Sequence, residues 1–102
     1  MSDYDFIIVG AGSAGSALAN RLSKDSDKRV LLLEAGGPDS HPWLRVPMGY
    51  GKVFYDKRVN WKYTTEPNET LDGNRIYWPR GKVMGGSSSI NAMVYVRGHP
   101  KD

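Results

Sequence analysis

The first 34 residues contain two short apolar runs separated by one amphipathic stretch. Residues 4–9 are rich in β-branched and aromatic side chains and end at a glycine cluster, and residues 29–34 repeat that apolar character. A short apolar run bounded by glycine is typical of a strand that is buried on both faces. Between the runs, residues 13–24 carry an apolar stripe at helical spacing, which should pack against a sheet. The residues of this stripe are Ala14, Ala17, Leu18 and Leu22.

The pattern changes in the middle of the chain. Residues 36–60 mix glycine, proline, aromatic and charged residues without a clean period. We expect a long, loop-rich excursion there, with one helical turn around residues 43–48. The order strand, helix, strand before this excursion predicts a βαβ unit with parallel strands and a right-handed crossover.

A third pattern follows the excursion. Residues 61–65 and 75–78 have the composition of short strands, and the turn signal at 71–74 between them predicts a β-hairpin. Residues 80–91 begin as a glycine-rich loop and should enter a short helix at the three serines. Residues 93–96 are apolar again.

Composition narrows the class of protein. The 102 residues are enough for one small domain, and a formal net charge of +3 makes the chain mildly basic. The absence of cysteine excludes a disulfide scaffold and a Cys-based zinc site, and no other cluster has metal-ligand spacing. No apolar run approaches the ~20 residues that span a bilayer. The acidic start, Met1–Asp5, does not resemble a signal peptide. We therefore expect a cytoplasmic protein, with peripheral membrane association left open.

Residues 10–15, Gly-Ala-Gly-Ser-Ala-Gly, match G-x-G-x-x-G between the first expected strand and the helix. In this position the pattern indicates a Rossmann-like loop that binds a dinucleotide. Gly10 permits the tight turn, Gly12 lets a diphosphate approach the backbone, and Gly15 lets the helix pack closely on the sheet. The helix N-terminus offers free N–H groups to phosphates.

Glu34 stands where the second strand ends, about 20 residues after the glycine pattern, as a dinucleotide-binding loop requires. Its carboxylate can accept hydrogen bonds from the adenosine ribose. It would repel a 2′-phosphate, which argues against NADP. The pattern does not separate NAD from FAD, because both carry an ADP half.

A second glycine motif lies at residues 80–91, where two consecutive glycines precede three serines and an asparagine. Its backbone N–H groups could approach a phosphate or the polar edge of a flavin ring, and adding a Cβ at Gly86 would then push the cofactor away. The same residues could equally form a Gly-Gly turn that leads into a serine N-cap. From the residues alone, both interpretations stay open.

Together these segments resemble the N-terminal part of a glucose–methanol–choline (GMC) oxidoreductase, and most of all its choline dehydrogenase and alcohol dehydrogenase branch. The resemblance covers essentially the whole chain and is most specific at residues 78–98. It also rests on residues 5–15, 32–36 and 61–67.

The resemblance implies an enzyme that uses FAD to take a hydride from an alcohol carbon, with dioxygen or another electron acceptor reoxidising the flavin. By position, the residues expected to hold the ADP half are Gly10, Gly12, Ser13, Ala14, Gly15, Glu34 and Ala35. Those expected along the rest of FAD are Gly85, Gly86, Ser87, Asn91, Ala92 and Val94. Some members of the family attach FAD covalently through a histidine at the position of Ile90, so we expect non-covalent FAD here.

The family's catalytic base is a histidine, paired with a second His or an Asn, in a distant C-terminal segment that nothing in this chain matches. His41 and His99 are expected to be surface or loop residues, so no catalytic residue is assigned. We therefore expect residues 1–102 to be a partial FAD-binding domain that is inactive alone. The alcohol, whether choline, aliphatic or aromatic, and the choice between oxidase and dehydrogenase stay open.

Two other functions deserve comparison. An NAD-binding module accounts for residues 5–34 but leaves residues 85–91 unexplained. A nucleic-acid-binding module would exploit the basic and aromatic residues that alternate in residues 52–63. The small charge excess and the nearby acids Asp56 and Glu66 favour a structured segment without a nucleic-acid partner. The expected fold class is thus α/β, with a βαβ unit, a loop-rich excursion and a short hairpin.

Overall fold

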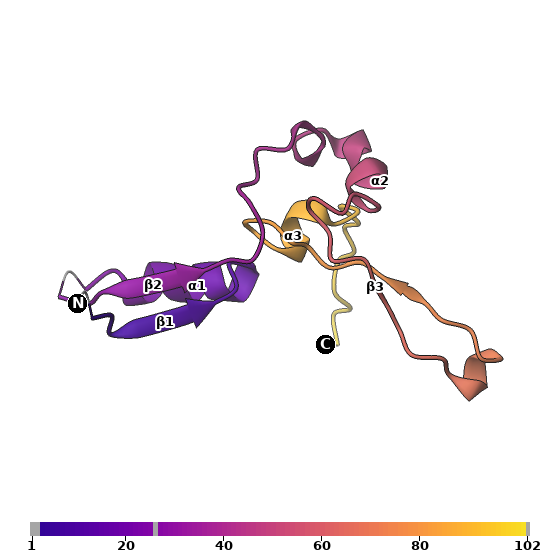
Figure 1. The fold of residues 1–102 in the computed structure, drawn as a ribbon, viewed down its shortest axis with the longest axis horizontal. Coiled ribbons are helices and arrows are strands. Elements are labelled where there is room, and N and C mark those ends of the chain that lie inside the picture. The colour runs from indigo at the N-terminus through magenta and orange to yellow at the C-terminus, as the bar shows by residue number, and fades with distance from the viewer. Residues whose placement is uncertain (1–2, 26, 102) are drawn as a thin grey trace.

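The computed structural model describes residues 3–25 and 27–101, and Met1 and Ser2 of the acidic start lie outside this range. Figure 1 shows three parts: a βαβ unit, a looped excursion beside a short helix, and a hairpin arm. In chain order the elements are β1 (Phe6–Val9), α1 (Ser13–Leu22), β2 (Val30–Leu33), the 3-10 turns η1 (Pro42–Leu44) and η2 (Pro47–Gly49), α2 (Tyr50–Val53), β3 (Tyr63–Thr64), η3 (Glu69–Leu71), β4 (Tyr77–Trp78) and α3 (Ser87–Ile90).

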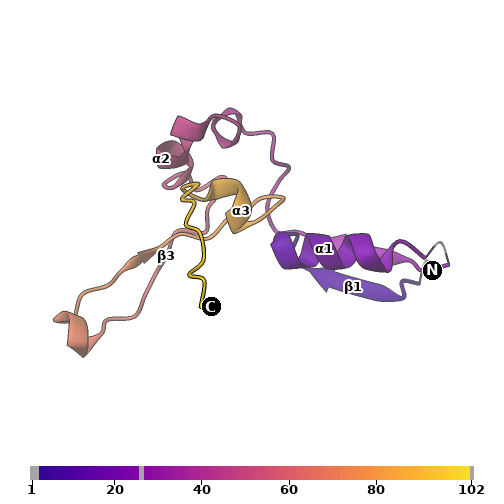
Figure 2. The ribbon, with the colours of Figure 1, turned by 180° about the vertical axis from the view of Figure 1, so that it is seen from behind.

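The βαβ unit confirms the α/β prediction. Strands β1 and β2 pair in parallel, with a register that runs from Phe6 opposite Val30 to Val9 opposite Leu33. Helix α1 lies along one face of this two-stranded sheet (Figure 2). The helix begins directly after the glycine loop, with Gly12 as its N-cap.

The rotation of α1 differs from the sequence prediction. The residues turned toward the sheet are Gly15, Ala19 and Leu22, whereas Ala14, Ala17 and Leu18 are exposed, and Leu18 keeps 49% of its surface in solvent. The reason is steric. A Cβ on residue 15 would lie 1.9 Å from the Gly10 carbonyl oxygen, so only glycine lets the helix approach the loop at this point. Residues four and seven positions after Gly15 then share its face.

The prediction that β1 is buried on both faces is also wrong for the described residues. Ile8 is 8% exposed, but Ile7 and Val9, which point to the opposite face, are 61% and 82% exposed. Adjacent side chains of a strand point to opposite faces of a sheet. Helix α1 covers only one face, and no element of the described residues covers the other.

The main apolar core lies outside the βαβ unit. Val53, Val59, Val83 and Ile90 form one buried cluster, and Leu44 packs against it. These residues come from α2, the end of the excursion, the second glycine motif and α3. The expected helical turn around residues 43–48 is present as η1 and η2 and continues into α2. The core thus joins the excursion to the second glycine motif.

Three polar side chains close the excursion near its two ends. The Arg58 guanidinium donates to the Asp56 carboxylate at 2.6 Å, and His41 Nε2 lies 3.1 Å from the same carboxylate. His41 Nδ1 accepts the Trp43 N–H and so caps η1. The Arg58 side chain and the Arg58 N–H hold the pKa of Asp56 well below its ordinary value, because both donate hydrogen bonds to the charged form.

The hairpin is confirmed, although its regular strands are short. Strands β3 and β4 pair antiparallel with Tyr63 opposite Trp78, and the ladder continues past them through the Trp61 N–H bond to Arg80 O at 2.8 Å. The predicted turn contains Asp72, at φ 53°, and Gly73, at φ 73°. The arm projects away from the other parts (Figure 1).

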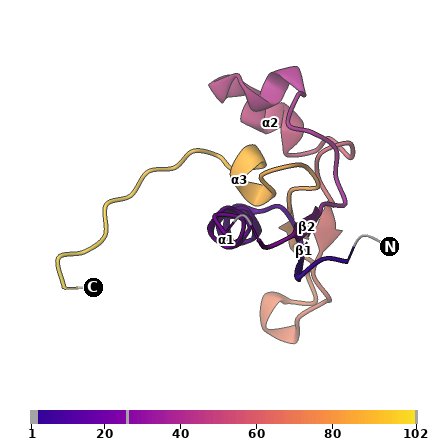
Figure 3. The same cartoon turned by 90° about the vertical axis from the view of Figure 1, so that its left-hand side faces the viewer.

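The residues after α3 run in an extended path away from the rest of the chain (Figure 3). Val94, Tyr95 and Val96 are all strongly exposed. The radius of gyration is 17.3 Å, well above the ~13 Å of a compact domain of about 100 residues. Within the described ranges, no helix is long and apolar enough to cross a membrane.

Replacing Asp56 by Asn should lower the free energy of unfolding by roughly 1–3 kcal/mol at pH 7, because hydrogen bonds to a charged group are lost. The carboxyl pKa is lower in the folded state than its unfolded value of about 3.9. The carboxylate therefore stabilises the fold above that unfolded pKa, and this contribution is lost as the pH falls below it.

Urea unfolding at pH 7, 5 and 3 measures the effect. The difference between wild type and Asp56→Asn should be full at pH 7 and 5 and should shrink at pH 3. Asp39→Asn, an exposed acid of the same excursion, is the matched control. A difference that is the same at all three pH values would contradict the assignment.

Candidate functional site

The two glycine motifs, residues 10–15 and 80–91, lie against each other although they are far apart in sequence. The Gly85 N–H donates to the Ala11 carbonyl at 2.9 Å, and the Met84 N–H donates to the Gly37 carbonyl at 2.9 Å. Gly37 and Val83 also form a parallel bridge. The second motif is therefore fixed to the first glycine loop and to the chain that leaves β2.

Glycine makes this contact sterically feasible. A Cβ on Gly36 would lie 2.1 Å from the Lys82 carbonyl carbon, and one on Gly81 would lie 2.1 Å from the Gly86 carbonyl oxygen. A Cβ on Gly86 would face the Gly12 Cα at 3.0 Å. The first two distances are too short for any side chain unless the backbone shifts, and the third is tighter than most real Cβ contacts.

Gly86 is constrained both by its backbone conformation and by its contact with Gly12. Its backbone lies at φ 61°, ψ −139°, a conformation that L side chains rarely adopt. An added Cβ would point at Gly12, so substitution would act through backbone strain and through the contact between the two motifs. The structure thus adds a second effect of substitution here, and the expectation that a Cβ would also stand between an N–H group and the cofactor stays a prediction.

Glu34 joins the same assembly from the end of β2. Its Oε2 accepts the Ala11 N–H at 2.8 Å, and its Oε1 accepts the Gly36 N–H at 2.9 Å. The side chain is half-buried. One carboxylate thus fixes the first glycine loop to the exit of β2, and each oxygen keeps further acceptor capacity, because a carboxylate oxygen has two lone pairs.

The start of α1 is open toward the same side. Gly12, the N-cap, provides no side-chain hydrogen bond, and a Cβ on it would meet nothing within 4 Å. The first N–H groups of a helix have no partner inside the helix. Close by, the Ser13 hydroxyl forms a hydrogen bond with the Ser88 hydroxyl. The N–H groups of Ser13, Ala14 and Gly15 therefore belong to an end that can receive an anion.

A hollow of about 610 Å³, which we call the main hollow, is lined by Gly10 and Gly12 of the glycine loop and by the end of β2. This volume is typical of a small-molecule site. Six residues singled out from the sequence line it: Gly10, Gly12, Glu34, Ala35, Gly86 and Ser87. The structure therefore brings members of both motifs to one cavity.

One side of the main hollow was not predicted from the sequence. It is formed by the end of the hairpin that adjoins the excursion, which we call the hairpin root. Trp61, Tyr63 and Arg80, which we call the basic aromatic wall, also line the main hollow. The Trp61 and Tyr63 rings are stacked at 5.8 Å and 6°. Lys82 Nζ lies 4.6 Å from the Trp61 ring centre, so the wall carries positive charge beside an aromatic face. Aromatic residues at positions i and i+2 of an expected strand were the sequence signal for it.

Three of the predicted residues lie in a neighbouring cleft. Asn91, Ala92 and Val94 line a shallow depression of about 480 Å³, which shares Ser87 with the main hollow. The Asn91 side chain is engaged with nearby backbone, since Nδ2 donates to Ser88 O and Oδ1 accepts the Met93 N–H. The roles of these residues stay predictions.

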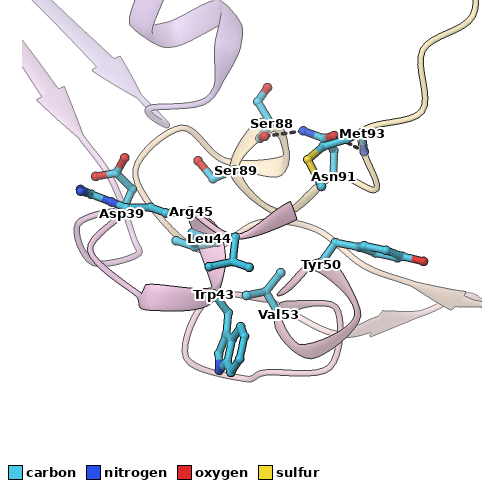
Figure 4. Close-up of a pocket in the computed structure, with 11 residues that line it drawn as sticks. Asp39, Trp43, Leu44, Arg45, Tyr50, Val53, Ser88, Ser89, Asn91 and Met93 are labelled. Carbon is cyan, nitrogen blue, oxygen red and sulfur yellow. Dashed lines mark hydrogen bonds between the residues drawn. The ribbon is translucent and has the colours of Figure 1, made fainter. Parts of the chain in front are cut away.

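A smaller cavity of about 130 Å³ separates the excursion from α3 (Figure 4). Trp43, Leu44 and Val53 line it from one side, and Ser88 and Asn91 line it from the other. It adjoins the cleft of Asn91 and Val94 through shared residues. No residue predicted for the ADP half reaches it.

Comparison with known proteins assigns the chain to a family. Residues 4–102 match the model of the GMC oxidoreductase family. The chain is 57% identical over 99 residues to an alcohol dehydrogenase [acceptor] of Pseudomonas putida, and 56% identical over 98 residues to an oxygen-dependent choline dehydrogenase of Rhizobium etli. These alignments cover 97% and 96% of this chain but 18% of each relative.

Solved structures with a similar fold are also found. The chain superposes on pyridoxine 4-oxidase from Mesorbium loti with a TM-score of 0.86 and 44% identity, covering 97% of this chain and 19% of that one. It matches an FAD-dependent oxidoreductase from Chaetomium thermophilum with a TM-score of 0.73 and 33% identity, covering 94% of this chain and 16% of that one.

The chain belongs to the GMC oxidoreductase family. The resemblance seen in the sequence is thereby confirmed, and so is FAD as the cofactor expected for a member of this family. The NAD-binding alternative loses its support, because the second glycine motif that it left unexplained is part of the GMC match and of the main hollow.

The histidines of this GMC chain lie away from the main hollow. His41 is held between the Trp43 N–H and Asp56, as described above. His99 belongs to the extended C-terminal stretch, where its Nδ1 accepts the Lys101 N–H. That neither is the catalytic base stays a prediction. Among residues 3–25 and 27–101, no three His, Asp or Glu side chains form a group that could hold a metal.

Replacement of Gly36 by Ala should destabilise the fold by roughly 1–3 kcal/mol or more, because the new methyl overlaps the Lys82 backbone. Gly37→Ala is the matched control, since a Cβ on the neighbouring glycine meets nothing within 4 Å. Thermal unfolding of both variants measures the contrast. Equal melting temperatures for the two variants would contradict this account of how the motifs meet.

Proposed function

We propose that residues 1–102 are the N-terminal part of the FAD-binding domain of a longer oxidoreductase. In this proposal the enzyme oxidises the CH–OH group of a primary alcohol, choline-like, aliphatic or aromatic, and dioxygen or another acceptor takes the electrons. The proposal is carried by the convergence of both glycine motifs, Glu34 and the basic aromatic wall on one hollow in a GMC chain. A cytoplasmic location remains a prediction.

The main hollow suits the ADP half of FAD. Glu34 would accept hydrogen bonds from the adenosine ribose at the end of β2, as carboxylates do in this type of fold. The open N-terminus of α1 beside Gly12 would receive the diphosphate. Trp61 offers an aromatic face, with Lys82 near it, on which an adenine ring could stack.

The second glycine motif and the residues after α3 would extend the cradle toward the flavin. Gly86 and Ser87 line the main hollow, and Ser87 continues into the cleft of Asn91, Ala92 and Val94. Ile90, the position at which some relatives are expected to attach the flavin, is 4% exposed and belongs to the apolar core. A hydrocarbon side chain directed into the core supports non-covalent FAD.

The chemistry divides between this chain and the rest of the enzyme. Bound FAD supplies the acceptor for a hydride from the alcohol carbon. This chain's residues would bind and orient the cofactor, and a base outside residues 1–102 would remove the hydroxyl proton. The alcohol and the electron acceptor are chosen by residues beyond this chain.

Glu34→Ala in the full-length protein should weaken FAD retention and relax discrimination against a 2′-phosphate. The wild-type apoprotein should bind ADP roughly tenfold or more tightly than ADP with an added 2′-phosphate, a difference of about 1.4 kcal/mol per tenfold. In Glu34→Ala that ratio should approach one, because the repelling carboxylate is gone.

Calorimetric titration with the two nucleotides measures this ratio. Loss of the Ala11 and Gly36 hydrogen bonds will also lower stability. Both ligands meet the same variant, however, so a stability effect cancels from the ratio. An unchanged ratio would remove Glu34 from the ribose site.

The 102-residue chain alone should not oxidise alcohols, even with FAD added, because no residue in it matches the family's base. Reduction of an artificial dye, with choline, ethanol and benzyl alcohol as substrates, measures the activity. The control is the same concentration of free FAD. Alcohol-dependent reduction above that control would place a catalytic base within residues 1–102.

A further inference from the structure

Asn60 is the one fully buried polar side chain among the described residues, with 2% exposure. Its Nδ2 donates to the Phe54 carbonyl at 2.7 Å. Its Oδ1 accepts two backbone N–H groups, from Lys62 at 2.9 Å and from Arg80 at 3.1 Å. A buried amide with both ends satisfied is a strong local constraint, because each bond would be costly to break away from water.

The two N–H groups held by Oδ1 belong to opposite strands of the hairpin root. Lys62 directly follows Trp61, and Arg80 faces Trp61 across the ladder, where its carbonyl accepts the Trp61 N–H at 2.8 Å. Lys62 lies at φ 56°, a left-handed conformation that is unfavourable for a lysine. The bond from its N–H to a side chain two residues earlier is the kind that stabilises such a turn.

This turn sets the direction of the Trp61 and Tyr63 side chains. Lys62 stands between them, and their rings lie parallel at 5.8 Å in the lining of the main hollow. A residue held at positive φ by the surrounding structure often marks a functional site. Here the constraint comes from Asn60, which does not itself line the hollow.

We propose that Asn60 is a positioning residue, which holds the basic aromatic wall in the orientation that receives the adenine end of the cofactor. This inference rests on the proposed function, since it assumes that the main hollow takes the ADP half of FAD. Asn60 would act through the Lys62 and Arg80 backbone and would not contact the ligand.

Tyr77 provides a matched control. Its hydroxyl donates to the same Phe54 carbonyl at 2.6 Å, so it anchors the hairpin root to the excursion as Asn60 Nδ2 does. The Tyr77 hydroxyl also accepts a long bond of 3.4 Å from Asn60 Nδ2. Within the described residues it bonds neither Lys62 nor Arg80, and it does not line the main hollow. Tyr77→Phe therefore weakens the anchor while leaving the Oδ1 bonds in place.

The test uses apoprotein of the full-length protein and two probes, ADP and FMN, titrated by calorimetry beside melting temperatures. Asn60→Ala should bind ADP roughly tenfold more weakly, the scale expected for a lost stacking contact, and should bind FMN as wild type does. Tyr77→Phe should melt at a lower temperature and keep wild-type affinity for both probes. Asn60→Asp keeps acceptor oxygens for both N–H groups but loses the Nδ2 donor to Phe54, so it should melt at a lower temperature than wild type and still bind ADP more tightly than Asn60→Ala.

A purely structural role gives a different result. Asn60→Ala would then lower the melting temperature as Tyr77→Phe does, with ADP affinity unchanged or with ADP and FMN weakened alike, and either outcome overturns the inference. If Asn60→Ala does not fold, Asn60→Ser replaces it, because a serine hydroxyl can serve the Lys62 N–H but is too short to serve both groups. Its ADP affinity should then fall between those of Asn60→Asp and Trp61→Ala.

Different results would contradict the proposed function and the positioning role of Asn60. If the wild-type apoprotein binds no ADP, or if Glu34→Ala leaves ADP binding unchanged, the assignment of the main hollow is wrong. If the wild type binds ADP through Glu34 but Asn60→Ala and Asn60→Ser bind it equally well, only the positioning role is lost.

Discussion

The contact of residues 81–86 with the first glycine loop and with the chain that leaves β2 is the constraint on which the rest of the structure depends. It is made by backbone against backbone, through the Gly85 bond to Ala11 and the close approach of Gly36 to Lys82. Because no side chain separates the segments, their relative position has little freedom. The cofactor site proposed for this GMC chain is therefore built from two glycine motifs in fixed register.

The apolar core packs around the second glycine motif and contains no residue of the two-stranded sheet. Val83, at the centre of the second motif, packs with Val53, Val59 and Ile90 and so fixes the motif to the excursion. The βαβ unit, by contrast, leaves Ile7 and Val9 largely exposed. A sheet with helices on both faces would bury these side chains, as parallel sheets generally do. The chain spans 18% of the length of each of the two dehydrogenases that it matches, so most of each relative lies outside the alignment.

The charges around the main hollow are arranged as the proposed binding of a dinucleotide requires. Glu34 places a carboxylate at one side, where ribose hydroxyl groups can donate to it, and Arg80 and Lys82 place positive charge near the aromatic face. The carboxylate also holds the glycine loop through Ala11 and Gly36. One side chain thus contributes both to the shape of the loop and to the selectivity proposed for it.

The sequence by itself determined the local elements, and it singled out six of the residues that line the main hollow. Glycine, β-branched residues and helical spacing act over a few residues, so the βαβ unit, the hairpin and the serine helix could all be predicted from neighbours in the chain. The family likeness carried the prediction further, to the residues of both glycine motifs. Gly10, Gly12, Glu34, Ala35, Gly86 and Ser87 do meet at one hollow.

Only the tertiary structure decided which face α1 turns to the sheet, what Gly86 contacts, and that Trp61 lines the hollow. Each of these depends on a contact that forms only in the folded chain: Gly15 meets the Gly10 carbonyl, Gly86 meets Gly12, and the Trp61 N–H bonds to the Arg80 carbonyl. Hydrophobic periodicity describes how often a side chain recurs on a face. It carries no information on which face a close backbone contact will select, because that selection is made by atoms that come together only when the chain folds.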